Sequence, residues 1–225
     1  MHKEIKTPWG VIFPQVSLFP ILYLLFIYGF VYILPYGRDL IGISWFDWLR
    51  REDGPLEWIQ FIEYAISSIL ALLIYVRTKR KKNINAIIWL LIAFLSFVIA
   101  GEEISWGERI TGIGINSISD INVQGETNFH NLPFFHNYFL DPIFEISCIF
   151  LGWFGWRKFK NIKALPSKDL SLYFLFVALF YFYFDLSWAS TTQQIRNDQE
   201  IFEFLLSTGI FLHCYKNFKK LDFVS

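Results

Sequence analysis

Long apolar runs alternate with short charged connectors along the whole chain. Because a helix rises about 1.5 Å per residue, roughly 20 apolar residues cross the ~30 Å hydrocarbon core of a bilayer. The sequence therefore predicts an all-α, polytopic integral membrane bundle of about six transmembrane helices, forming a single domain over residues 1–225. The predicted spans are residues 16–36, 56–76, 84–102, 139–156, 169–188 and 200–215, and the last must extend to about Phe218 to cross fully.

The connectors fall into two classes by the sign of their charge. Residues 1–6, 77–82, 157–169 and 216–222 hold 15 of the 20 Lys and Arg but only 3 of the 20 Asp and Glu. Basic connectors stay on the cytoplasmic side of a membrane, so both termini are predicted to be cytoplasmic and the acidic connectors to face outward. The lysines and arginines lie where this topology alone requires them, so no nucleic-acid partner is predicted; the expected partner is the lipid bilayer.

Several ionisable residues lie inside the apolar runs, near their outward ends. Glu57 begins the second run, and Gln60 and Glu63 follow it on one stripe of the expected helix. Ionisable groups within a bilayer are costly and usually face a bundle interior, where they serve function. We therefore expect an outward-facing, acid-rich polar cavity, covered by the long connector 103–138. Further residues expected to line it are Asp141, Glu145, Asp185 and Glu200.

The third run ends in an acidic pair, Glu102 and Glu103. The carboxyl end of a helix carries a partial negative charge, so an acidic pair there needs a cation, a proton or a positive side chain as partner. Arg109 would share a helix face with Glu102 if the helix continued. The alternative interpretation is a salt-bridged helix end in the headgroup layer.

Polar residues occupy every second position from Asn122 to His130. An extended chain would place them on one face, whereas a helix would stack Asn122, Glu126 and His130. Either arrangement brings a carboxylate near an imidazole, which suits metal binding, a general base or hydrogen bonds that fix the loop. The spacing matches no zinc signature. The hypothetical ligands of a divalent metal ion are Glu102, Glu126 and His130, with Gln124, Asn128 and Asn131 beside them.

Two blocks of sequence resemble a group of bacterial multi-spanning membrane proteins. They are Gly101-Glu-Glu-Ile-Ser-Trp-Gly-Glu-Arg109 and Asn122-x-Gln-Gly-Glu126-x-Asn-x-His130-Asn131, and the Asp53-Gly54-x-x-Glu57-Trp58 start of the second run is similar too. The resemblance covers roughly residues 50–135. The group has no established activity, so the resemblance implies a topology, a site and a bacterial inner (plasma) membrane, but no reaction.

Three functions stay open from the sequence. The first is a membrane enzyme, with or without a metal ion, acting on a lipid-linked or periplasmic substrate. In it Glu102, Glu103, Glu126 and His130 serve as ligands or acid/base groups and Arg109 clamps an anion. The second is a proton- or cation-coupled transporter that uses Glu63, Glu145 and Asp185. The third is an accessory subunit whose outer loops bind a membrane-protein partner.

Overall fold

The computed structural model describes residues 5–7, 10–12, 14–33, 43–51, 54–79, 84–122, 125–129, 132–133, 140–184 and 193–222. The described chain is helical apart from one small antiparallel hairpin, β1 (Ile5–Thr7) and β2 (Gly10–Ile12), in which Thr7 pairs with Gly10. The prediction of a helical fold is confirmed.

Six helical rods make up most of the described chain, and some of them consist of consecutive segments. The first three are α1 (Pro14–Leu24) continuing into η1 (Leu25–Ile33), α4 (Pro55–Thr78), and α5 (Ile84–Glu103). The other three are α9 (Leu140–Ile149) with η4 (Phe150–Phe154) and α10 (Gly155–Lys158), α11 (Ser171–Phe184), and α12 (Gln193–Asp222). The shorter elements are α3 (Ile43–Arg50), η3 (Ser105–Gly107), α6 (Glu108–Thr111), α7 (Asn116–Ser119) and η5 (Lys168–Leu170).

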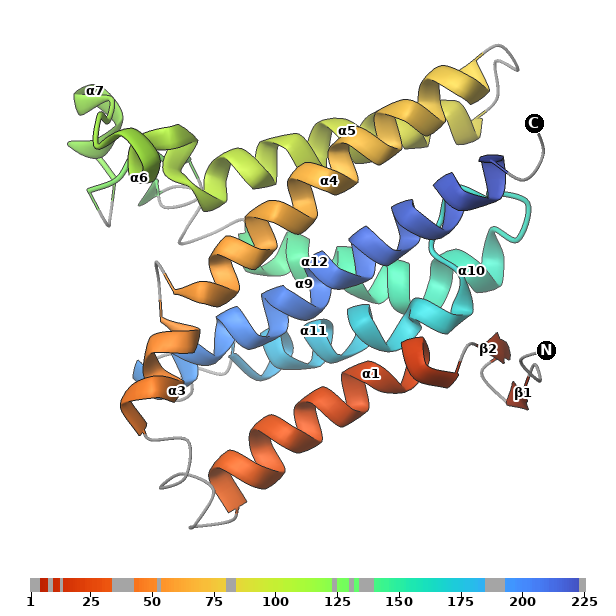
Figure 1. Cartoon of the computed structure of the whole chain (residues 1–225), viewed down its shortest axis with the longest axis horizontal. Coiled ribbons are helices and arrows are strands. Elements are labelled where there is room, and N and C mark those ends of the chain that lie inside the picture. Colours follow the sequence, from red (N-terminus) through yellow and green to blue (C-terminus); the bar gives the residue numbers. More distant parts are fainter. Residues whose placement is uncertain are drawn as a thin grey trace.

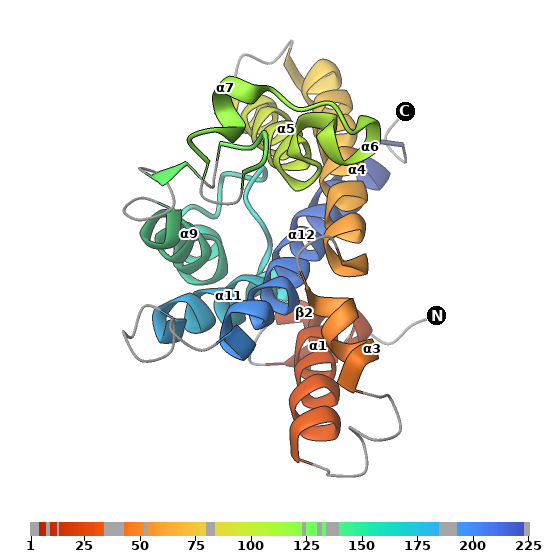
Figure 2. The same ribbon diagram turned by 90° about the vertical axis from the view of Figure 1, so that its left-hand side faces the viewer.

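The rods pack side by side in alternating directions (Figure 1). Helix α4 lies between α5 and α12, and α11 packs against α12, α9 and α1. Viewed from the left of Figure 1, α6 and α7 lie over the end of α5 (Figure 2). The predicted spans fall on these rods, although the described part of α11 is shorter than its predicted span of 169–188 and α12 is longer than its span of 200–215.

The two ends of the bundle carry the two classes of connector. The end of α4, the start of α5, α10 and the end of α12 lie together on the right of Figure 1, whereas α3, α6 and α7 lie on the left. Basic residues of the first end include Arg77, Arg157 and Lys216. The charge sorting along the sequence is thus a charge difference between two ends of the molecule.

Helices α4 and α5 pack through seams of mostly small side chains spaced three and four residues apart. On α5 the buried residues include Ala86, Ala93 and Ala100, one every seven residues, and Ser67 and Ala71 lie on the buried side of α4. Small residues let helix backbones approach closely, and this spacing keeps one stripe of each helix facing its partner. Glu57 and Gln60 continue the buried stripe of α4 and therefore point into the bundle.

The basic end is fixed by a loop clamped between two helices. The backbone N–H of Ala164 donates to Asn85 Oδ1 at 3.0 Å, and Ala164 O lies 2.9 Å from His213 Nε2. The His213 ring also stacks on Trp89, with centroids 4.9 Å apart. These contacts give His213 a structural role and hold α5, α12 and the 157–168 connector together.

Two apolar helical stretches of the described chain are long enough to cross a membrane: one within 46–78, most of which is α4, and α5 over 84–103. Only 28% of the most apolar window of each is buried inside the molecule. A core helix of a water-soluble protein is mostly buried. In these two helices most of the apolar surface instead lies on the outside of the molecule.

Candidate functional site

A left-handed turn ends α5 directly after Glu103. Ser105, Trp106 and Gly107 have φ values of 47°, 52° and 95°. The turn folds the Trp106 ring back over Gly101, where an added Cβ would lie 3.0 Å from the ring. The helix therefore does not continue toward Arg109, and the expected helix face shared by Glu102 and Arg109 does not form.

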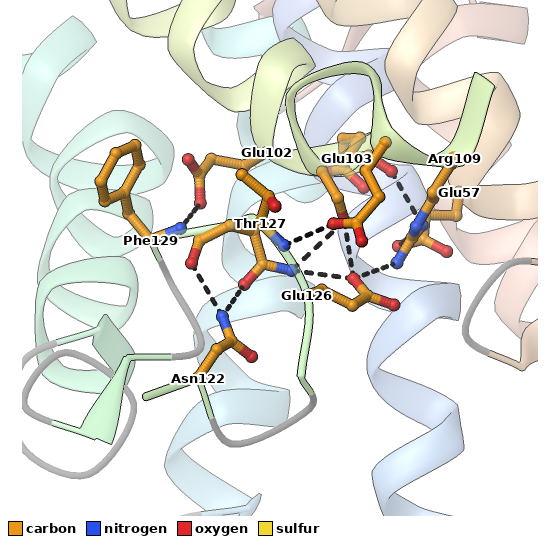
Figure 3. Close-up of polar contacts among 11 residues, drawn as sticks. Glu57, Glu102, Glu103, Arg109, Asn122, Glu126, Thr127 and Phe129 are labelled. Carbon is orange, nitrogen blue, oxygen red and sulfur yellow. Dashed lines mark hydrogen bonds and ion pairs between the residues drawn. The ribbon is translucent and has the colours of Figure 1, made fainter. Parts of the chain in front are cut away.

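Arg109 joins the start of α4 to the connector. Its Nη1 lies 2.6 Å from Glu57 Oε1 and donates to the backbone oxygen of Glu103 at 2.8 Å, while Nη2 lies 3.2 Å from Glu126 Oε2 (Figure 3). The side chains of Arg109 and Glu57 are only 12% and 10% exposed. Because two carboxylates already engage the guanidinium, this geometry assigns Arg109 a positioning role and does not support the anion clamp that we considered.

The connector after α7 is held by a chain of hydrogen bonds around Glu126 (Figure 3). Glu126 Oε2 accepts from Ser105 Oγ at 2.6 Å and from Asn128 Nδ2 at 3.0 Å. Asn122 Nδ2 donates to both Oδ1 and the backbone oxygen of Asn128, each at 2.8 Å. Described residues of this segment form bends, with Gly125 at a φ of 75°. The described residues of this segment, Asn122 and 125–129, therefore form neither an extended strand nor a helix.

Glu102 and Glu108 also accept hydrogen bonds from the connector. The backbone N–H of Phe129 donates to Glu102 Oε2 at 2.7 Å, and Trp106 Nε1 donates to Glu102 Oε1. The backbone N–H of Thr127 donates to Glu108 Oε2 at 2.7 Å. These two partners of Glu102 are neutral N–H donors, and the contacts support the interpretation that the motif fixes the loop.

Glu103 is the exception within this group. It interacts electrostatically with Arg109 and with three other carboxylates, those of Glu57, Glu102 and Glu203. Among the residues that the structure describes, none donates a hydrogen bond to its carboxylate, and the side chain is partly exposed. Glu103 is thus a carboxylate held within a group of charged side chains, with no hydrogen-bond donor to it among the described residues.

A second polar group lies between α4 and α12. Gln60 Nε2 donates to Glu200 Oε2 at 2.9 Å, and Glu63 Oε2 accepts from Ser207 Oγ at 2.5 Å and Thr208 Oγ1 at 3.0 Å. Gln60 is fully buried, and its Oε1 has no hydrogen-bond partner within the described chain. The predicted residues Glu63 and Glu200 therefore face one helix interface. No hydrogen bond between described residues joins them to the group around Arg109, but the Glu200 carboxylate interacts electrostatically with those of Glu57 and Glu103.

Other predicted site residues are not joined to either group by a described contact. Glu145 is half-buried on α9, and no hydrogen bond or ion pair links it to another described residue. Gln124, His130, Asn131 and Asp185, and the side chain of Asp141, lie outside the described residues.

The described residues do not fit the hypothetical metal site. Within that part of the chain, no three His, Cys, Asp or Glu side chains are arranged to hold a metal ion. Both oxygens of Glu102 and Oε2 of Glu126 already accept hydrogen bonds from the protein. His130, the third hypothetical ligand, lies outside the described residues.

Sequence reasoning missed one buried ion-pair group altogether. Arg50 on α3 is 2% exposed and contacts Asp198 of α12 and Asp47, the latter at 2.9 Å. The aromatic residues Trp45, Phe46 and Trp48 beside charged residues predict a short helix lying in the headgroup layer of the membrane. The sequence shows that Asp47 lies three residues before Arg50 and could pair with it. It gives no sign that Asp198, 148 residues further along the chain, is the second partner.

Comparisons with known proteins add no assignment: no family model matches the sequence, no curated protein matches it, and no solved structure matches its fold. The resemblance to the bacterial membrane group therefore stays a prediction, and the argument for function comes from the geometry of this chain.

Proposed function

We propose that this protein is a polytopic membrane protein with about six spans, with cytoplasmic termini, in a bacterial inner membrane. Three observations support this proposal. The rods alternate in direction, the basic connectors share one end, and the apolar windows of α4 and α5 are mostly unburied. A surface of that kind in water would expose far more apolar area than monomeric proteins do.

We propose further that the protein is an enzyme whose active site is the group around Glu103 and Arg109. There it would transfer a proton to or from a polar group of a lipid-linked or periplasmic substrate. The observation that carries this proposal is the state of Glu103, which lies among charged side chains but receives no hydrogen bond from a described residue. A carboxylate that is surrounded by like charges and receives no hydrogen bond suits general acid–base work.

The neighbours of Glu103 hold it in place and set the charge of the site. Arg109 binds the backbone oxygen of Glu103 and the carboxylates of Glu57 and Glu126. Two carboxylates pair with the guanidinium, and the Glu103 carboxylate interacts electrostatically with Arg109 and Glu102, so carboxylates outnumber the one cation and the site disfavours anions. The substrate group bound here is therefore neutral or cationic.

The first test is Glu103→Gln, which keeps the size of the side chain and removes its proton transfer. The purified protein is incubated in vesicles of total bacterial polar lipid, and the lipid species are followed by mass spectrometry. We expect wild-type protein to convert a lipid species and Glu103→Gln to be slower by on the order of 100-fold. Asp120→Asn, at an exposed residue of the connector, is the control and should retain full activity. Equal rates for wild type and Glu103→Gln, or no conversion by either, would refute the assignment.

A second candidate function, proton or cation transport, is favoured by Gln60. Its buried, unpartnered Oε1 lies beside Glu200, on the face of α4 that also carries Glu63. A buried carbonyl without a donor is costly unless a bound water, proton donor or cation satisfies it.

The transport hypothesis predicts loss of flux in two variants. Glu63→Gln and Gln60→Met should each reduce proton or cation flux into proteoliposomes by about tenfold or more, equivalent to ~1.4 kcal/mol of binding free energy. Ser68→Ala, which removes a hydroxyl bonded to Ala93 O, serves as the matched α4 control. Flux unchanged by both variants would exclude this function.

A further inference from the structure

We infer that the isoleucine connector, defined as residues 104–122, lies in the boundary between headgroups and acyl chains of the outer leaflet. The acid/base site is then reached from the lipid, and its substrate is an amphiphile with a neutral or cationic headgroup. This inference rests on the membrane function proposed above and adds the class of substrate and its route of entry.

The first observation is the exposure of four isoleucines on this short segment. Ile110, Ile113, Ile115 and Ile121 are 62%, 79%, 53% and 60% exposed. Single exposed apolar residues are ordinary, but a contiguous set marks an interaction surface. A loop bathed in water would be expected to present polar side chains at these positions.

The second observation is that the connector presents little charge. Its charged residues are Glu108, Arg109 and Asp120. Glu108 accepts from Thr127 N at 2.7 Å, and Arg109 is paired with Glu57, so both are engaged inside. Of the three, Asp120 is exposed. The exposed surface of the connector therefore carries one charge and combines the isoleucines with uncharged polar side chains such as Asn116 and Ser117, as expected for a segment in the membrane interface.

The polar groups of the connector are largely satisfied locally. The backbone N–H of Gly112 donates to Glu108 O at 2.7 Å, and that of Asp120 donates to Asn116 O at 2.9 Å. Thr111 Oγ1 donates to Gly107 O at 2.9 Å. Local hydrogen bonds lower the cost of moving backbone away from water, which a segment at the lipid boundary requires.

The third observation identifies the occupant of this surface as lipid. An aromatic series joins the connector to the exposed face of α5: Phe97 and Trp106 have centroids 6.1 Å apart, as do Trp106 and Phe129. All three rings are partly exposed, and Phe94 and Leu91 extend the same apolar exposure down α5. The connector thus continues the surface that we assign to the bilayer, and tryptophan is enriched at such interfaces.

Trp106 also connects this surface to the acid/base site. Its ring belongs to the aromatic series, while its Nε1 donates to Glu102, beside Glu103. An amphiphile held by the acyl region next to the rings would bring its headgroup to Glu103 without leaving the membrane. This route explains why an acidic site adjoins an apolar surface.

Site-specific probes test the depth of the connector. In the full chain with Cys148→Ala and Cys214→Ala, single cysteines are introduced by Ile113→Cys, Leu91→Cys and Asp120→Cys and labelled with an environment-sensitive fluorophore. Each protein is placed in vesicles of phosphatidylethanolamine and phosphatidylglycerol, with spin-labelled lipid or aqueous iodide as quencher. An interfacial segment lies ~5–10 Å into the boundary, so lipid quenching at Ile113 should be within about twofold of that at Leu91. The Asp120 probe should be quenched by iodide.

The outcomes separate the two proposals. If the Leu91 probe is quenched by iodide and not by lipid, the membrane function itself fails. If the Leu91 probe is lipid-quenched but the Ile113 probe is iodide-quenched, only the interfacial connector is refuted. If neither quencher reaches the Ile113 probe, a protein surface covers it, which also overturns the assignment to lipid.

Discussion

Replacing Arg109 by methionine is expected to destabilise the fold by about 3–5 kcal/mol, the usual cost of removing one partner of a buried ion pair. The guanidinium lies 2.6 Å from Glu57 and 3.2 Å from Glu126, and it is 12% exposed. Without it, these two carboxylates stay close to Glu103 and lose their counter-charge. Thermal and denaturant unfolding in detergent, followed by tryptophan fluorescence, measures the loss.

Two further variants test the cause of this effect. Arg109→Lys keeps the charge but not the planar fork that reaches two carboxylates and a carbonyl, so an intermediate loss is expected. Adding Glu57→Gln to Arg109→Met should recover part of the stability, because one unpaired carboxylate is then neutral. If the double variant is less stable than Arg109→Met by the full effect of Glu57→Gln alone, the two residues are not coupled.

The helices could be predicted from the sequence because their signals are local. The Gly54-Pro55 start and the basic residues after Thr78 bracket α4, and the predicted span 56–76 lies within its observed range, Pro55–Thr78. The apolar run of α5 likewise gives its range to within one residue. The spacing of apolar residues and the charges at helix ends are local features of the sequence. They can therefore be recognised without knowing how the helices pack.

The location of the acid-rich site was also predictable, but its pairing was not. Glu102 and Glu103 stand out because an acidic pair is disfavoured at the carboxyl end of a helix, and Glu57 and Arg109 lie near them in the expected cavity. Pairing Arg109 with Glu57 and not with Glu102 depends on the left-handed turn at Ser105 and Trp106. Two non-glycine residues rarely adopt this conformation, and packing of the Trp106 ring over Gly101 accompanies it here. Local propensity gives no warning of such a turn.

Arg50 illustrates the limit of this kind of inference. Its neighbours Trp48 and Leu49 suggest a helix in the headgroup layer, and Trp48 is indeed 40% exposed. The buried side of the same helix carries Phe46 and Arg50, and the guanidinium lies 4.7 Å from the Phe46 ring centroid. The side of α3 that faces the protein interior is determined by its packing on α12, which is distant in the sequence.

Arg50→Met is expected to cost about 3–5 kcal/mol of unfolding free energy, since it would leave the Asp198 carboxylate, 10% exposed, without its cation. Tyr28 donates to the other oxygen of Asp198 at 3.1 Å, but a hydroxyl does not neutralise the charge. The loss should also release α3 from α12, so proteolysis near Arg51 should become faster than in wild type.

The neighbouring residue supplies a matched control for this prediction. Arg51 is exposed, so Arg51→Met should change stability by no more than about 0.5 kcal/mol. Arg50→Met combined with Asp198→Asn should be more stable than Arg50→Met alone, because the uncompensated charge is removed together with its partner. Equal effects of Arg50→Met and Arg51→Met would show that α3 is not held by its buried guanidinium, and the attachment of α3 to the start of α12 would then have to come from apolar contacts such as those of Phe46.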